Sequence, residues 1–172
     1  MGNNEINARW PGSCFGCSPN NPIGLKLRFR HAERGCETRC SIPDSLCGFD
    51  GLVHGGILST ILDETAAWAL FAHLGRFAVT RELTTSFIKP VATNTEVIVE
   101  GRVVSHDKVK AQVHCSIRSP EGVLLAEAES DWVFVKTSRI ASLAGVDEEV
   151  LCDFLKQCVA KKLSNDDRCA GK

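Results

Sequence analysis

Residues 51–64, with the sequence GLVHGGILSTILDE, combine a pair of glycines with two carboxylates on one predicted helix. The helix begins at Gly55 and Gly56 and has no Ser, Thr or Asp directly before it, so its first amides have no evident side-chain cap. Uncapped amides at the positive end of a helix dipole suit a carbonyl oxygen that gains negative charge, or another anion. A tight turn that requires glycine would explain the same pair equally well.

Asp63 and Glu64 lie in the middle of this helix, whose other residues are almost all apolar. A carboxylate in such a place is costly unless it is paired or functional. Contact with solvent or with an arginine such as Arg81 is the alternative interpretation. Adjacent helical residues point about 100° apart, so we expect the two acids to serve different purposes.

The spacing between the glycines and Asp63 predicts an oligomer. Asp63 follows Gly55 by eight residues, which corresponds to about 12 Å along a helix. An oxyanion donor and a base must both lie within about 3 Å of one reacting carbonyl group. One chain cannot satisfy this requirement, so the Gly55 amide of one subunit would have to face Asp63 of another. We therefore predict a homodimer or a dimer of dimers with composite sites.

The cysteines raise the question of a metal site. The chain has nine, an odd number, scattered between Cys14 and Cys169, and we interpret them as reduced thiols of a cytoplasmic protein. Cys14 and Cys17 form one half of a conceivable zinc site, with Cys36 and Cys40 as the other half. The second pair falls in a predicted strand, where these residues stand about 13 Å apart. We therefore predict no metal, and the lack of a βαβ unit disfavours a redox Cys-x-x-Cys motif.

The elements that must position these residues follow from the periodicity of apolar residues. Apolar residues cover nearly the whole circumference of the helix predicted at 57–73, which indicates burial on most sides. Alternation of apolar and polar residues predicts strands at 23–30, 36–42, 79–87, 96–105, 109–118 and 124–136. The late strands are joined by short connections, which require antiparallel pairing. The predicted fold class is α+β, with a curved antiparallel sheet of about six strands wrapped around one long buried helix.

The chain divides into a main domain and its flanks. We predict an irregular leader at residues 1–22, one domain at 23–137, a C-terminal helical extension at 138–163 and a disordered tail at 164–172. The helix of the extension is expected at 147–163, with acidic residues at its start and lysines at its end, as the helix dipole favours.

The composition excludes several classes of partner. The 172 residues suffice for one domain with a modest extension. With 20 Lys and Arg against 21 Asp and Glu, the net charge of −1 offers no field that would attract nucleic acid or an acidic membrane surface. No apolar stretch is long enough to span a bilayer, and no secretory signal is evident. We expect a cytoplasmic protein that binds neither nucleic acid nor membranes.

The His-Gly-Gly motif at residues 54–56, with Asp63 nine residues after the histidine, resembles the hotdog-fold acyl-CoA thioesterases. The nearest group is the thioesterases of the phenylacetate-pathway type. The segments 14–29 and 83–90 also resemble that family, so the likeness extends from residue 14 to residue 136. The resemblance implies hydrolysis of an acyl-CoA to a free acid and CoA, in a homodimer or homotetramer, with no cofactor.

The resemblance also implies roles for individual residues. Asp63 would be the general base or nucleophile, and the Gly55 amide would polarise the thioester carbonyl. Thr80 would help to hold the attacking water, and His54 would organise the loop. The remaining residues expected to contact substrate are Gly56, Thr84, Thr85 and Ser86.

One departure from the family pattern affects the expected rate. Cys47 and Gly48 stand where the family often has an Asn or Gln that contacts the thioester oxygen. Loss of one such donor costs about 10²–10³ in rate, unless Asp50 or a water replaces it. A non-catalytic module that binds acyl-CoA or an acyl carrier is therefore an alternative function. A hydratase or dehydratase of enoyl thioesters is less favoured, because the loop around His54 does not match those families.

Overall fold

The computed structural model describes residues 5, 6 and 10–169, with side chains described as far as Val159. Its main feature is a six-stranded sheet in the order β1-β2-β6-β7-β8-β5. Every neighbouring pair in this sheet is antiparallel, as predicted. The strands are β1 Phe29–Ala32, β2 Gly35–Ser41, β5 Ala78–Phe87, β6 Glu96–His106, β7 Lys110–Arg118 and β8 Leu124–Phe134.

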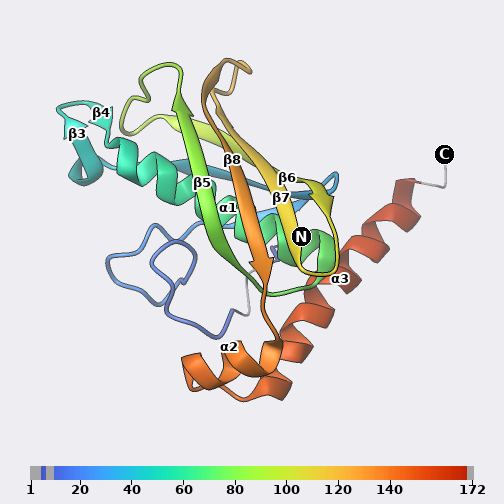
Figure 1. Cartoon of the computed structure of the whole chain (residues 1–172). Coiled ribbons are helices and arrows are strands. Elements are labelled where there is room, and N and C mark those ends of the chain that lie inside the picture. The colour runs from blue at the N-terminus through green and yellow to red at the C-terminus, as the bar shows by residue number, and fades with distance from the viewer. Residues whose placement is uncertain (1–4, 7–9, 170–172) are drawn as a thin grey trace.

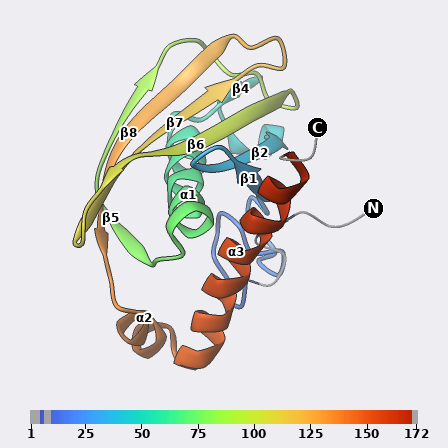
Figure 2. The same ribbon diagram turned by 90° about the vertical axis from the view of Figure 1, so that its right-hand side faces the viewer.

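The sheet curves around one long helix, α1 (Gly55–Leu74), as Figures 1 and 2 show. Half of the residues of α1 are buried, including Leu62, Trp68 and Leu70, because the helix is covered on more than one side. It ends at Gly75, whose backbone is left-handed (φ 60°) and whose amide donates a hydrogen bond of 3.1 Å to the Phe71 carbonyl. This arrangement is the hotdog fold that the sequence predicted.

A second layer covers the side of α1 that faces away from the sheet (Figure 2). It consists of the leader and the C-terminal helix α3 (Glu148–Cys169), and the short helix α2 (Thr137–Ala144) packs against α3. Trp10 of the leader and Phe154 of α3 meet with ring centroids 5.1 Å apart. Trp68 of α1 lies 6.0 Å from Trp10 and 5.7 Å from Phe154. The extension therefore completes the core of its own chain.

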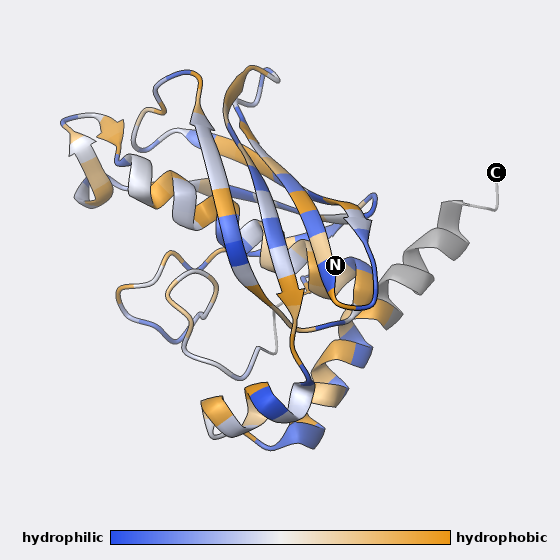
Figure 3. Cartoon of the chain, viewed as in Figure 1, coloured by the Kyte–Doolittle hydropathy of each residue, from blue (hydrophilic) through white to orange (hydrophobic). Residues whose placement is uncertain are grey.

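A small hairpin lies before the first turn of α1 (Figure 1). It pairs β3 (Cys47–Phe49) with β4 (Leu52–Val53) and follows a short 3-10 helix at Asp44–Leu46. Figure 3 shows hydrophobic and hydrophilic residues mixed along the strands of the large sheet, as expected where one face is buried. None of the helices in the described part of the chain is both long and apolar enough to cross a membrane.

The structure differs from the predicted first strand. Residues 23–28 are not in a strand, and pairing begins only at Phe29. The Leu25 and Leu27 amides instead donate to the Phe15 and Gly16 carbonyls, at 2.8 and 2.9 Å. The alternation of residues 23–30 therefore reflects contact with the leader, and Ile23 remains 78% exposed.

The C-terminal region also differs from the prediction. The helix α2 was not predicted, and α3 continues to Cys169 instead of ending at Leu163. Residues 164–169, which were expected in the tail, continue α3, and no Gly or Pro interrupts the sequence between Glu148 and Cys169. The remaining tail residues, 170–172, lie outside the described part of the chain.

Candidate active site

Asp63 of α1 is bound by a hydroxyl from the edge strand β5. Thr80 Oγ1 donates to Asp63 Oδ1 at 2.7 Å. The Asp63 side chain is half-buried, and this burial raises the pKa of its carboxyl group. The hydrogen bond from Thr80 acts in the opposite direction, and the nearby charge of Glu64 raises the pKa further. The sequence did not predict this contact, and the expected role of Thr80 in holding the attacking water stays a prediction.

The two adjacent acids of α1 have different surroundings. The charge of Asp63 reaches Cys115 on β7, where it adds to burial in raising the pKa of that thiol. Asp63 therefore faces the sheet. Glu64 instead accepts a hydrogen bond of 3.0 Å from Trp68 Nε1 and lies against the leader. The expectation that the two acids serve different purposes agrees with this divergence.

The first turn of α1 has a cap that the sequence did not reveal. His54 Nδ1 accepts a hydrogen bond of 2.9 Å from the Gly56 amide, and the His54 carbonyl accepts one of 2.9 Å from Ile57. The expectation of several uncapped amides is therefore wrong, because an imidazole nitrogen replaces the usual Ser, Thr or Asp oxygen. The Gly55 amide has no acceptor among the described residues. His54 thus caps the first turn of α1 and leaves one amide available, while its role as organiser of the loop stays a prediction.

Both glycines have a side chain close to the position that a Cβ would occupy. A Cβ at Gly55 would lie 3.3 Å from Phe87 Cζ, and a Cβ at Gly56 would lie 3.1 Å from His54 Nδ1. The pair therefore leaves space for the capping imidazole and for the Phe87 ring. The turn interpretation and the amide-donor interpretation of these glycines are compatible.

An apolar pocket of about 540 Å³ opens beside the Gly55 amide. Its walls come from the β3–β4 hairpin, the start of α1 and the segment after β5. They include Phe49 and Phe87, which are 81% and 56% exposed. Such exposed aromatic side chains at a pocket are typical of a surface that binds an apolar ligand or a partner. Sequence reasoning missed Phe49, although a phenylalanine in a Gly-rich turn was a usable signal.

Within one chain the predicted site is divided in two. The pocket is lined by His54 and Gly55 but by neither Asp63 nor Thr80. Gly55 and Asp63 lie on the same continuous helix, so the helical rise of about 12 Å between them holds. The structure brings Asp63 to Thr80 and Gly56 to His54, but it does not bring these two groups together.

The three predicted substrate residues on β5 do not share one face. Alternation along a strand places Thr85 on the same side as Leu83 and Phe87. Thr84 lines a separate polar pocket of about 170 Å³ with Gln112 and Glu129, and Ser86 lies on that same side. Contact with substrate remains a prediction for all three, and Thr85 is the one directed toward α1.

The loop before His54 has no Asn or Gln side chain at positions 47 and 48 that could donate to the thioester oxygen. Gly48 lines the apolar pocket, and a Cβ there would lie 3.3 Å from His54 Cα. Cys47 begins β3 and pairs with Val53. No amide side chain is present at either position, so the Gly55 amide is the donor that the pocket offers at the start of α1.

Comparison of the structure with known proteins agrees with the hotdog fold. A thioesterase superfamily protein named RHA08564 has a TM-score of 0.63 at 22% identity, over 70% of this chain and 61% of that one. The E. coli PaaI protein of the phenylacetic acid degradation operon has a TM-score of 0.61 at 17% identity, over 65% and 81%. A hypothetical thioesterase of Streptococcus pneumoniae with coenzyme A has a TM-score of 0.59 at 18% identity, over 63% and 85%.

Comparison of the sequence finds a superfamily match over part of the chain. Residues 50–126, which hold Gly55, Asp63 and Thr80, match the sequence pattern of the thioesterase superfamily. An uncharacterised protein of Schizosaccharomyces pombe is 39% identical over 46 residues, which are 26% of this chain and 26% of that protein. The chain thus covers only about a quarter of that relative and less than two thirds of RHA08564. The structural comparisons thus confirm the hotdog fold, and residues 50–126 are similar to the thioesterase superfamily.

Proposed function

We propose that the protein hydrolyses acyl-CoA thioesters to a free acid and CoA, as a thioesterase of the phenylacetate-pathway type. The observation that carries this proposal is the half-buried Asp63 carboxylate held by Thr80, within the segment that matches the thioesterase superfamily. A carboxylate in this position attacks the thioester carbonyl directly or activates a water that does so. The apolar pocket beside Gly55 suits the acyl group.

The proposed site is shared between two subunits. The Gly55 amide of one subunit polarises the thioester carbonyl, and Asp63 of the partner subunit supplies the attacking group. Two observations support this division: the available amide and the carboxylate lie two turns apart on one helix, and the pocket at Gly55 excludes Asp63. In a twofold dimer each pair of subunits forms two such sites. The edge strand β5, which is unpaired on one side in the described chain, offers a surface along which two copies can associate.

Mixed dimers test the shared site. Gly55→Pro removes the amide hydrogen, and Asp63→Asn removes the base. A dimer with one Gly55→Pro subunit and one Asp63→Asn subunit contains one site with both defects and one intact site. We expect about half of wild-type turnover from this mixed dimer, isolated with two different affinity tags, and almost none from either homodimer. If each site lay within one chain, the mixed dimer would be as inactive as its parents.

A second candidate function rests on Gly48. Because no side-chain donor is present there, a binding module for acyl-CoA or an acyl carrier is the alternative. Steady-state release of CoA from a panel of aromatic, short and medium acyl-CoAs, followed with a thiol reagent, separates the two functions. Saturable binding without turnover across the panel would favour the binding module. Hydration of an enoyl thioester is less favoured, because the loop around His54 does not match the hydratase families.

A further inference from the structure

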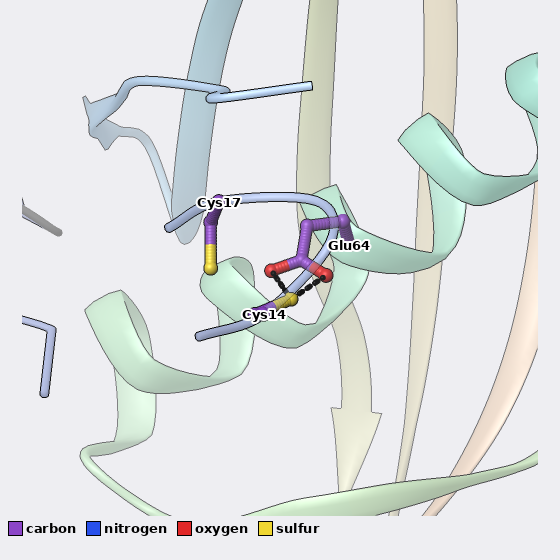
Figure 4. A group of neighbouring side chains, drawn as sticks. All are labelled: Cys14, Cys17 and Glu64. Atoms are coloured by element: carbon purple, nitrogen blue, oxygen red, sulfur yellow. Dashed lines mark hydrogen bonds between the residues drawn. The ribbon is translucent and has the colours of Figure 1, made fainter. Parts of the chain in front are cut away.

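Three side chains with metal-binding chemistry meet on the side of α1 opposite the sheet (Figure 4). They are Cys14 and Cys17 of the leader and Glu64 of α1, and their sulfur and oxygen atoms all lie within 4.8 Å of one another. Cys14 Sγ lies 3.5 and 3.3 Å from the two oxygens of the Glu64 carboxylate. None of the three belongs to the proposed active site.

The leader is folded closely around the Glu64 carboxylate. The Gly16 amide donates to Cys14 Sγ at 3.2 Å, and the Ser18 amide donates to the Cys14 carbonyl at 3.1 Å. A Cβ at Gly16 would lie 2.6 Å from Glu64 Oε2, so any larger residue would displace the carboxylate. The Cys-Phe-Gly-Cys turn therefore presents both sulfurs to Glu64 and leaves room for it.

The Glu64 carboxylate is also fixed from its own helix. Trp68 Nε1 donates to Glu64 Oε1 at 3.0 Å, and the Trp68 side chain is only 1% exposed. A hydrogen-bond donor behind a ligating carboxylate is the usual way in which proteins orient a metal ligand. This contact holds the second oxygen, Oε2, toward the cysteine turn.

We propose that Cys14, Cys17 and Glu64 bind a zinc ion that fastens the leader to α1. Two thiolates and a carboxylate are donors that zinc accepts, whereas calcium and magnesium prefer oxygen alone. With zinc–sulfur and zinc–oxygen bonds of about 2.3 and 2.1 Å, a tetrahedral site places sulfur and oxygen about 3.5 Å apart. The observed Cys14–Glu64 distances of 3.3 and 3.5 Å match this value. Water completes the tetrahedron.

This site differs from the one weighed in the sequence. Cys36 and Cys40 do not join the cluster: Cys36 Sγ is directed to the Thr65 carbonyl at 3.4 Å. Glu64 takes the place that a second cysteine pair would have had. The predicted absence of a metal rested on the spacing of Cys36 and Cys40, and it did not consider a carboxylate from the helix.

Metal content and cobalt spectroscopy of the full-length protein test the proposal. The protein is purified with reductant, and its zinc content is measured by inductively coupled plasma mass spectrometry. The metal is then removed with a chelator, and the metal-free protein is titrated with Co²⁺. We expect one metal per chain and the sulfur-to-cobalt charge-transfer absorption of a tetrahedral thiolate site. Cys14→Ser with Cys17→Ser should abolish both signals, and Glu64→Gln should weaken Co²⁺ binding at least about tenfold. Cys152→Ser, a half-buried cysteine of α3 outside the cluster, is the matched control and should bind as the wild type does.

Several results would overturn the zinc site. One is the absence of Zn²⁺ and Co²⁺ binding by the reduced wild-type protein, and another is unchanged affinity in Glu64→Gln. A disulfide between Cys14 and Cys17, detected as the loss of two hydrogen atoms in the intact mass and formed equally with and without zinc, would assign the thiols to redox chemistry instead. If the double cysteine variant fails to fold by circular dichroism, the wild-type spectrum and the Glu64→Gln titration decide the question.

Discussion

The Thr80 hydroxyl donates a hydrogen bond of 2.7 Å to Asp63 Oδ1 and so connects the edge strand β5 to the middle of α1. The hydroxyl occupies one carboxylate oxygen, while Asp63 Oδ2 has no hydrogen-bond partner among the described residues. One oxygen is therefore positioned by the protein and the other is available to a substrate or a water. This is the arrangement that a base or nucleophile requires.

Replacing Asp63 with Asn should abolish turnover and preserve the fold. The amide keeps the size of the side chain but cannot accept a proton or attack a carbonyl, so we expect kcat to fall by about 10²–10⁴. Substrate binding should remain, because the pocket at Gly55 is not altered. Steady-state release of CoA and calorimetric binding of an acyl-CoA analogue measure the two effects. Asp153→Asn, at an exposed position of α3, is the control, and wild-type turnover in Asp63→Asn would eliminate Asp63 as the catalytic group.

Replacing Thr80 with Val tests the positioning hydrogen bond. Valine has the same shape but lacks the hydroxyl, and a hydrogen bond to a carboxylate contributes about 1.5–3 kcal/mol. We expect kcat to fall on the order of 10- to 100-fold with little change in KM. Thr80→Ser restores the hydroxyl and should recover most of the rate. A Thr80→Ser variant as slow as Thr80→Val would show that the hydroxyl is not what matters at this position.

Replacing Gly55 with Pro removes the one available amide hydrogen at the start of α1. Proline is tolerated at the first helical position, and His54 already has the extended backbone (φ −63°, ψ 132°) that a residue before proline prefers. We expect a loss of about 10²–10³ in kcat, the usual cost of one oxyanion donor.

Gly55→Ala is the matched control for this change, because it adds a Cβ near Phe87 but keeps the amide hydrogen. It should retain far more activity than Gly55→Pro, and equal losses in the two variants would point to crowding against Phe87 instead of a lost donor. Circular dichroism and thermal unfolding of both variants confirm that α1 is intact.

The elements with strong periodicity were predictable, and the side-chain partnerships were not. The bounds of the four strands after α1 follow from the alternation of apolar residues and the turns between them, whereas α1 follows from a long apolar segment between Gly55 and Gly75. The alternation of apolar residues in 23–28 has another origin. The Leu27 amide donates a hydrogen bond to the Gly16 carbonyl of the leader, and this segment does not pair with a strand of the sheet. A period of two reports burial of alternate side chains, and it does not distinguish a sheet neighbour from a loop.

Two features near α1 depended on tertiary geometry. The cap of α1 depends on the orientation of the His54 ring, which places Nδ1 at 2.9 Å from the Gly56 amide. Cys14 and Glu64 are 50 positions apart in the sequence and come into contact only because the leader folds against α1. Neither contact has a local signature in sequence, whereas Asp63 and Thr80 could be named from a resemblance that includes both positions.

Asp44 supplies a prediction about pH and stability. Its carboxylate accepts hydrogen bonds from Thr93 Oγ1 and from Asn94 Nδ2, the second at 2.7 Å, and so ties the segment before β3 to the turn before β6. The Thr93 bond, followed by the Asn94 bond, lowers the pKa of Asp44 below its ordinary value. The folded state therefore binds this proton less readily than the unfolded state. The resulting stabilisation is present above the ordinary pKa of about 3.9 and is lost as the pH falls through the lower pKa of the folded protein.

Asp44→Asn removes both the charge and its titration. We expect the variant to have a lower Tm than the wild type at neutral pH, and we expect this difference in Tm to shrink as the pH falls below about 4. Thermal unfolding measured across this range, with Asp50→Asn in the exposed turn between β3 and β4 as the control, tests the expectation. Because the Gly51 carbonyl accepts the Thr93 amide at 3.0 Å, loosening this tie also loosens the hairpin that lines the apolar pocket. A difference in Tm that stays constant down to acidic pH would show that the Asp44 charge does not contribute to folding.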